Sequence, residues 1–324
     1  MNKKILVSGG TGYLAVNLIT MLKDTACHIV RLGRIGAKFA MVSGKARVED
    51  LIGDICKRTT WEQALQGVDL VYHFAAQTSV YVANENPAVD LESNVLPMLH
   101  LLETCRSRDI GAAVVFSGTV TEAGIPSRLP MGETHPDHPV TIYDLHKLMA
   151  EHYLKYYANQ GMVSGVSLRL ANVYGPGPRS SSADRGVLNQ MVRKALRGEP
   201  LTVYGTGGHV RDYVYIDDVT RAFLAAGVHS ARLNGQHFVI GSGQGHTIAE
   251  AAYLVAERVA MKIGQHVSVR HIEPPQPQSP IEVRNFVANT TRFAQTTGWQ
   301  ACISLVEGID RTIEAFLTEE HISS

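Results

Sequence analysis

The sequence predicts an α/β fold: a parallel sheet covered by helices on both faces, with a smaller C-terminal lobe. Two observations support this prediction. Short apolar runs alternate with helix-like segments through the first half of the chain, which is typical of a doubly wound parallel sheet. The first apolar run also leads through a glycine-rich turn into a helix-like segment, as in proteins that bind dinucleotides.

The first strand is expected at residues 4–8, an apolar run that ends at the turn Gly9-Gly10-Thr11-Gly12. The following residues, from Tyr13 and Leu14 onwards, have helical apolar spacing. Glycines let a pyrophosphate approach the backbone, and the start of a helix offers it unpaired N–H groups. The sequence therefore predicts dinucleotide contacts at Gly9, Gly12, Tyr13 and Leu14.

Four more strands and two long helices are expected after this turn. The strands are predicted at 28–32, 68–74, 112–116 and 166–170, and the helices at 91–106 and 143–158. The glycine- and proline-rich residues 175–178 are expected to lead away from the sheet. We therefore predict a dinucleotide-binding part over 1–175 and a mainly substrate-binding lobe over 176–324, from which some segments return to the sheet.

Composition excludes several other classes of protein. Lys plus Arg and Asp plus Glu both number 30, which gives no electrostatic reason to expect nucleic acid or an anionic membrane as a partner. Apolar runs fall short of the ~18 residues of a membrane helix, and the early glycine turn leaves no room for a signal peptide. The four cysteines and the histidines lack metal-binding spacing. We expect a cytoplasmic protein without a metal.

The most informative pair is Tyr143 and Lys147, which stand four residues apart within a predicted helix and so share one face. A free tyrosine has a pKa near 10, so its use as a base near pH 7 requires a depression of about 3 units. One lysine in a high dielectric supplies only ~1 kcal/mol of the roughly 4 kcal/mol needed. An oxidised nicotinamide would supply a second positive charge, so the pair predicts a nicotinamide enzyme.

Several further segments carry a resemblance to a known family. They are His73–Gln77, Gly53–Ile55, Asn94, Arg169–Pro176, Val203–Val219 and Glu282–Asn289. With the glycine turn and the Tyr–Lys pair, they make the chain resemble the extended short-chain dehydrogenase/reductase family, in its nucleotide-sugar branch of epimerases, dehydratases and reductases. The resemblance covers nearly the whole length and implies a Rossmann-type sheet.

The resemblance also implies roles for individual residues. The implied cofactor contacts, beyond those of the glycine turn, are Asp54, Ile55, Phe74, Ala75, Ala76, Asn94, Ser117, Tyr143 and Lys147. The implied substrate is a nucleotide-diphosphate sugar, contacted by Asn172 and, at its diphosphate, by Arg211 and Arg284. A guanidinium binds two phosphate oxygens at once, which makes the arginine roles chemically reasonable.

The third catalytic residue is expected at the end of the fifth strand. The family places a serine or threonine five residues before a glycine, which selects Thr119 ahead of Gly124, with Ser117 and Thr121 as rivals. The hydroxyl of Thr119 would orient the sugar oxygen that gains or loses charge. Family 4,6-dehydratases carry Asp-Glu directly after this threonine. The chain has Val120 and Thr121 there, and neither is a general acid or base, so a dehydratase is not favoured.

The end of the second strand bears on the choice between NAD and NADP. An acid usually stands there and binds the adenosine ribose, which selects NAD. The chain has Gly33 at this position and Arg34 after it. The missing acid and the added arginine favour NADP, with stacking of Arg34 on the adenine of NAD as the alternative.

Two activities fit these residues equally well. One is an epimerase that acts at C4 through a transient 4-keto sugar, and the other is an NADPH-dependent 4-ketoreductase. The epimerase is favoured on family frequency alone. A non-catalytic dinucleotide-binding relative is less expected, because Thr119, Tyr143 and Lys147 are all present.

A homodimer is expected from two apolar helix stripes, since the family pairs these helices between subunits. The stripes contain Leu91, Val95, Met98, Leu99 and Leu102, and Leu148, Tyr153 and Tyr156. The alternative is that both stripes belong to the core.

Overall fold

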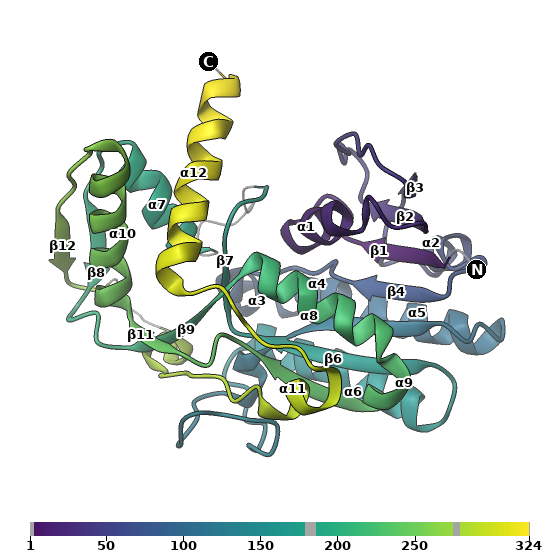
Figure 1. The fold of residues 1–324 in the computed structure, drawn as a ribbon. Coiled ribbons are helices and arrows are strands. Elements are labelled where there is room, and N and C mark those ends of the chain that lie inside the picture. Colours follow the sequence, from purple (N-terminus) through teal and green to yellow (C-terminus); the bar gives the residue numbers. More distant parts are fainter. Residues whose placement is uncertain (1–2, 179–185, 275–278, 324) are drawn as a thin grey trace.

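The computed structural model of the chain describes residues 3–178, 186–274 and 279–323, and its centre is a parallel sheet of seven strands (Figure 1). The strands are β1 (Lys4–Ser8), β2 (His28–Gly33), β3 (Arg47–Ile52), β4 (Leu70–His73), β5 (Ala113–Thr119), β6 (Ser164–Leu170) and β10 (Gln236–Ile240). They lie in the order β10-β6-β5-β4-β1-β2-β3. Strand order reverses at β1, which pairs with β2 on one side and β4 on the other. Ligands of open α/β sheets bind at the carboxyl ends of the strands beside such a reversal.

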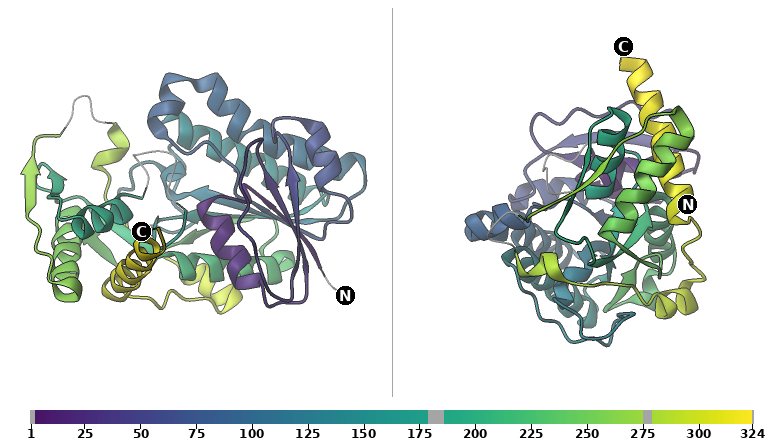
Figure 2. Two further views of the ribbon diagram at one scale, coloured as in Figure 1. Left: turned by 90° about the horizontal axis from the view of Figure 1, so that it is seen from above. Right: turned by 90° about the vertical axis from the view of Figure 1, so that its left-hand side faces the viewer.

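Helices cover both faces of this sheet, which confirms the predicted doubly wound architecture (Figures 1 and 2). One face carries α1 (Tyr13–Leu22), α8 (Ile216–Val228), α9 (Ser230–Leu233) and α11 (Thr291–Thr297). The other carries α2 (Arg58–Ala64), α5 (Leu96–Ser107) and α6 (Ile142–Asn159). Two more helices, α3 (Val80–Glu85) and α4 (Pro87–Asn94), pack against α6. Because both faces are covered, nearly all residues of the inner strands are buried.

The prediction of one helix over residues 91–106 is wrong, because the chain forms two helices there. α4 ends at Asn94 and α5 begins at Leu96. Pro97 lies in the first turn of α5. Proline has no N–H to donate and its ring clashes with the preceding turn, so a continuous helix is interrupted.

β3 has no counterpart among the predicted strands. Three of its six residues are charged and four are exposed, and it forms the edge of the sheet beside β2. An edge strand buries little apolar surface, so its sequence lacks the apolar run that marks the inner strands.

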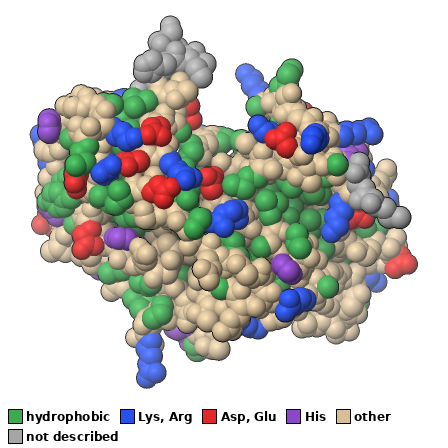
Figure 3. All heavy atoms as spheres, viewed as in Figure 1, with side chains coloured by type: hydrophobic (Ala, Val, Ile, Leu, Met, Phe, Trp, Pro, Cys, Tyr) green, Lys and Arg blue, Asp and Glu red, His purple; other side chains and the backbone are tan. Residues whose placement is uncertain are grey.

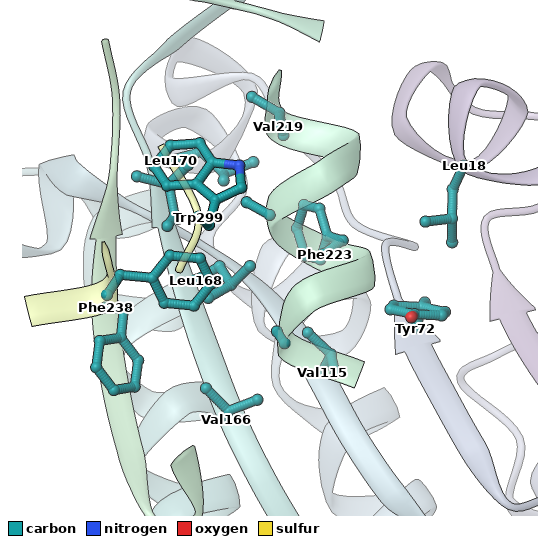
Figure 4. Close-up of a cluster of buried hydrophobic side chains, with 14 of the residues drawn as sticks. Leu18, Tyr72, Val115, Val166, Leu168, Leu170, Val219, Phe223, Phe238 and Trp299 are labelled. Atoms are coloured by element: carbon teal, nitrogen blue, oxygen red, sulfur yellow. The ribbon is translucent and has the colours of Figure 1, made fainter. Parts of the chain in front are cut away.

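The core on the α8 face joins side chains that are distant in the sequence (Figure 4). Phe238 of β10 packs against Phe293 of α11 with ring centroids 5.4 Å apart. Trp299 lies beside Leu170 and donates from Nε1 to the carbonyl of Asp218 at 2.9 Å. Burial of a large apolar side chain stabilises a fold by about 1.5–3 kcal/mol. Trp299 therefore anchors the segment after α11 in the core on this face of the sheet.

A second group of elements forms the lobe beside the carboxyl end of β6 (Figure 1). It contains β7 (Asn172–Tyr174), β8 (Leu201–Tyr204), β9 (Val210–Tyr215), β11 (Gly245–Thr247), β12 (Val269–Ile272), α7 (Val187–Leu196), α10 (Ile248–Ile263), α12 (Leu305–Ser323) and the short 3-10 helix η2 (Pro280–Val283). The strands form the sheet β11-β9-β7 and the pair β12-β8. Side chains of α7, α10 and α12 give the lobe its own apolar cluster.

Helix α1 contacts the segment through which the chain enters this lobe. The Tyr13 hydroxyl donates to the carbonyl of Gly175 at 3.0 Å, and the Asn17 amide donates to that of Pro176 at 3.3 Å. The glycine turn is thereby held next to the lobe. The predicted division at residue 175 stays a prediction, and β10, α8 and α11 follow that residue yet pack on the seven-stranded sheet.

The surface has no patch of a single charge on the face shown in Figure 3, where basic and acidic side chains are intermingled. This agrees with the balance of 30 basic and 30 acidic residues. In the described parts of the chain, no helix has the length and apolar character needed to cross a membrane.

Candidate active site

The glycine turn between β1 and α1 forms a narrow cradle. Gly9 has a φ of +69°, and a Cβ at this position would lie 3.0 Å from the backbone of Ala75. The N–H of Gly12 donates to the carbonyl of Gly9 at 2.7 Å, which closes the turn tightly. No side chain of the described residues caps the start of α1. The first N–H groups of α1 are therefore available to an anionic group such as a diphosphate, and the contacts at Gly9, Gly12, Tyr13 and Leu14 stay predictions.

The end of β4 is tied to the end of β1 through Ser8. Ser8 Oγ lies 2.7 Å from Nδ1 of His73 and accepts the backbone N–H groups of Phe74 and Ala75 at 3.1 and 3.2 Å. Since Oγ accepts twice, its own proton points to Nδ1, and His73 carries its hydrogen on Nε2. Burial, together with the charge of Lys147, lowers the pKa of His73 to about 3, so the ring is neutral. Ser8 thus places the residues after β4 against the glycine turn.

The predicted Tyr–Lys pair lies on α6, which packs against β5. Tyr143 and Lys147 are only 5% and 2% exposed. Lys147 Nζ lies 4.0 Å from the ring centroid of Phe116 on β5, a cation–π contact. The pair therefore stands in a dry environment over the strand that ends at Thr119.

Thr119 is held from both sides. Its backbone N–H donates to Glu122 Oε1 at 2.7 Å, and its Oγ accepts the N–H of Thr121 at 3.3 Å, which forms a capping box at the 3-10 helix η1 (Val120–Ala123). The Thr121 hydroxyl lies 2.9 Å from Thr119 Oγ and donates to the buried carboxylate of Asp144 on α6. Thr119 is thus connected through one hydroxyl to the residue that follows Tyr143.

A buried ionic cluster supports Thr119 from behind. Arg169 lies 2.5 Å from Asp137, 2.7 Å from Glu151 and 3.0 Å from Glu122. Burial, followed by the charge of Glu151, raises the pKa of Glu122 well above its usual range. For Glu151 the hydrogen bonds and charge of Arg169 outweigh burial and lower the pKa. These shifts favour a protonated Glu122 beside an ionised Glu151, so the Arg169 guanidinium has a negatively charged partner within the cluster.

The arginines predicted to contact substrate lie side by side. Arg211 of β9 is buried, and its guanidinium donates to the carbonyls of Glu282, at 2.6 Å, and of Arg284. Arg284 Nη1 donates to the carbonyl of Ile281 at 2.8 Å. Asn172 Oδ1 is buried, and the described residues offer it no hydrogen-bond partner. Two neighbouring guanidinium groups and the buried Asn172 Oδ1 are suited to bind a polar ligand. The substrate roles of Asn172, Arg211 and Arg284 stay predictions.

The residues expected near the adenine lie at the ends of β2 and β3. Arg34 is exposed. Gly33 is covered by Phe39, because a Cβ there would lie 2.6 Å from Phe39 Cζ. Asp54 Oδ1 accepts the N–H of Cys56 at 3.0 Å, and the carbonyl of Ile55 accepts Trp61 Nε1 at 2.8 Å. At the end of β2 the side chain nearest to position 33 is therefore the apolar Phe39, and no carboxylate stands at that position.

Two more predicted contacts are buried polar residues. Asn94 donates to the Gln77 carbonyl at 3.0 Å and to Asp90 Oδ1 at 2.9 Å, while its Oδ1 has no hydrogen-bond partner in the described chain. Ser117 donates to the carbonyl of His73 at 3.2 Å.

Within the described ranges, no three His, Cys, Asp or Glu side chains are grouped as metal ligands would be.

Sequence reasoning missed the polar partners of the predicted residues. Asp144 bonds to Thr121, and His146 Nδ1 lies 2.7 Å from Asp90 Oδ2, both in buried positions. Both residues stand inside the Tyr-x-x-x-Lys motif. The available signal was a polar side chain at each of these positions in a predicted catalytic helix. The sequence could not identify the partners, because Thr121 lies 23 residues from Asp144 and Asp90 lies 56 residues from His146.

Comparison with known proteins agrees with this fold. Together the two define a Rossmann-type protein of the extended short-chain dehydrogenase/reductase class. The chain belongs to the NAD-dependent epimerase/dehydratase family, whose model matches residues 5–241.

Three individual proteins are similar over nearly the whole chain. A putative UDP-glucose 4-epimerase of Methanocaldococcus jannaschii is 28% identical over 95% of this chain and 97% of its own. The UDP-glucose 4-epimerase of Thermotoga maritima, solved with UDP-glucose, has a TM-score of 0.86 and 28% identity over 98% and 99% of the two chains. The Thermus thermophilus UDP-glucose 4-epimerase, solved with NAD, has a TM-score of 0.83 and 30% identity over 97% and 99%.

Proposed function

We propose that the protein is an NAD(P)-dependent nucleotide-sugar epimerase that acts at C4 through a transient 4-keto sugar. The observation that carries this proposal is the buried Tyr143 and Lys147 on α6, over the strand that ends at Thr119. Likeness along the whole chain to UDP-glucose 4-epimerases supports a UDP-hexose as the substrate.

Four residues have a role in the proposed reaction. A bound nicotinamide would supply the hydride chemistry at the sugar carbon. Tyr143 takes the proton of the sugar 4-hydroxyl and later returns it, and the positive charge of Lys147 favours the phenolate. Arg211 and Arg284 hold the diphosphate, which keeps the nucleotide in place while the sugar turns over between its two faces.

The proposal is tested by incubating purified protein with UDP-glucose and analysing the sugar nucleotides by chromatography. We expect UDP-galactose to appear without added cofactor, since an epimerase regenerates its cofactor internally. Mass spectrometry of small molecules released from the denatured protein should identify the retained dinucleotide. No conversion of UDP-glucose or of any other UDP-hexose, in the presence of NAD or NADP, would contradict the proposal.

The second candidate is an NADPH-dependent nucleotide-4-keto-sugar reductase, and one observation favours it. Position 33 presents no acid and is covered by Phe39, while the exposed Arg34 follows it. Such a site does not repel a 2′-phosphate. A reductase must exchange its cofactor after each turnover, so weak and reversible NADPH binding would favour it over the epimerase. NAD bound to a similar epimerase supports the first candidate.

Replacement of Arg34 by alanine tests whether this residue gives the protein a preference for NADP over NAD. If Arg34 pairs with a 2′-phosphate, the wild type should bind NADP more tightly than NAD by ~10- to 150-fold, because a charge-assisted hydrogen bond contributes roughly 1.5–3 kcal/mol. Arg34→Ala should remove most of that preference in calorimetric titrations of stripped protein. Arg270→Ala, which removes an exposed arginine on β12, is the matched control. Equal binding of both cofactors by the wild type would refute this role for Arg34.

We further propose a homodimer formed through α6 and its neighbours. Val95, Met98, Leu102 and Leu148 are buried in the described chain and belong to its core, but Tyr156 on α6 is 60% exposed. Light scattering at micromolar concentration should give twice the chain mass of 35.3 kDa, and Tyr156→Asp should shift the protein towards monomer, because it places a charge in an apolar contact. A monomer mass for the wild type would exclude the dimer.

A further inference from the structure

The hydrogen bonds from Thr119 through Thr121 to Asp144 run in one direction. An ionised carboxylate only accepts hydrogen bonds, so the single proton of the Thr121 hydroxyl points to Asp144. In its 2.9 Å contact with Thr119, the Thr121 oxygen must then be the acceptor. Thr119 therefore donates its only hydroxyl proton to Thr121, away from any ligand.

Two observations support an ionised Asp144. It stands in the first turn of α6, where the helix dipole stabilises negative charge. The Thr121 hydroxyl donates to its carboxylate and stabilises the negative charge, which offsets the cost of full burial. The backbone N–H of Asp144 donates to the capping hydroxyl of Thr141 at 3.2 Å. These contacts fix the side chain beside Thr121.

We propose that Asp144, acting through Thr121, is a positioning residue that makes Thr119 a hydrogen-bond acceptor towards the sugar. Thr119 Oγ accepts one N–H, from Thr121 at 3.3 Å, and one lone pair remains for a ligand. This differs from the role expected from the sequence, in which the Thr119 hydroxyl orients the sugar oxygen that gains or loses charge. The inference rests on the proposed epimerase function.

The direction of this contact selects the sugar group that Thr119 binds. The reacting 4-hydroxyl gives its proton to Tyr143, so it cannot also donate to Thr119. An acceptor beside Tyr143 is useful to a hydroxyl that keeps its proton. On a hexose oxidised at C4, the ring hydroxyl next to the reacting carbon is the one on C3. Thr119 therefore orients the ring through the 3-hydroxyl, and the reacting oxygen belongs to Tyr143.

The test compares UDP-glucose with its 3-deoxy analogue in the wild type, Thr121→Val and Thr121→Ser. On UDP-glucose, Thr121→Val should lower kcat/KM about 10-fold, mainly through kcat, because the Thr119 hydroxyl is free to turn. Thr121→Ser keeps the hydroxyl and should stay within about 3-fold of the wild type. On the analogue, whose contact with Thr119 is already absent, Thr121→Val should cost less than about 2-fold.

An equal loss on both substrates would overturn the inference, because Thr121 would then act independently of the 3-hydroxyl. So would a Thr121→Ser variant as slow as Thr121→Val. Melting temperature and cofactor binding of each variant show whether it folds. Thr296→Val on α11, which removes an exposed hydroxyl bonded to its own helix, is the control for a threonine-to-valine change.

A separate measurement keeps this inference distinct from the proposed function. Infrared difference spectra of the wild type against Asp144→Asn report whether Asp144 is ionised, whatever the substrate is. An ionised carboxylate in the wild type supports the direction of the hydrogen bonds, and a protonated one overturns it. If the wild type converts no UDP-hexose while Asp144 is ionised, the epimerase assignment fails and the direction of the Thr119 hydroxyl stands.

Discussion

Replacement of Tyr143 by phenylalanine should lower the turnover of UDP-glucose by ~10²-fold or more while cofactor binding and folding stay nearly unchanged. The phenol is the group proposed to move the proton that accompanies hydride transfer, and phenylalanine keeps the ring but loses the hydroxyl. The Tyr143 ring is buried, so the shape of the site is preserved. Initial rates by coupled assay, with cofactor content measured on the same preparations, give the comparison.

Tyr253→Phe is the matched control, because Tyr253 lies on α10 in the lobe and is 52% exposed. It should turn over at close to the wild-type rate. Lys147→Met should also lose activity and, in addition, weaken cofactor binding if the amine contacts the nicotinamide ribose. Near-normal turnover by Tyr143→Phe would refute the assignment of Tyr143.

Replacement of Arg169 by leucine should lower the free energy of unfolding by about 3–5 kcal/mol, because it leaves buried carboxylates without their cation. Asp137 and Glu151 lose the guanidinium that lies 2.5 and 2.7 Å away, and Glu151 is fully buried. Chemical denaturation monitored by tryptophan fluorescence should show a lower midpoint. Activity should fall as well, since Glu122 in the same cluster holds the backbone N–H of Thr119.

Arg258→Leu is the control for loss of an arginine that pairs with a carboxylate. Arg258 contacts both oxygens of Asp310 at 2.8 and 2.6 Å, but both side chains remain about one-fifth exposed, at 23% and 21%. Solvent screening limits such a pair to about 1 kcal/mol. If the two variants lose similar stability, the buried cluster does not contribute as we infer.

The inner strands could be predicted from the sequence because they are buried on both faces and each contains a short apolar run. The same reasoning could not find β3, whose polar residues meet solvent at the edge of the sheet. The same reasoning could not place the boundary between α4 and α5 at Val95. The apolar spacing continues across this boundary, although a new helix begins there, with Pro97 in its first turn.

The candidate site shows a similar limit. Motif spacing predicted Tyr143 and Lys147, which lie within one helix. The partners of Thr119 could not be predicted, because Asp144 lies 23 residues from Thr121 and the two meet through tertiary packing of α6 on η1. Thr121 alone is neither acid nor base, and its importance depends on a carboxylate that another element supplies.

The late return of β10 to the sheet has a consequence for synthesis of the protein. β6 ends at Leu170, but the strand that covers its outer edge, β10, ends at Ile240. Ribosomes add roughly 5–20 residues per second, so about 4–14 s pass between completion of these two strands. During this interval β6 is an open edge with unpaired backbone groups, which is prone to pairing with other chains. The nascent polypeptide should therefore depend most on chaperones while the lobe is being translated.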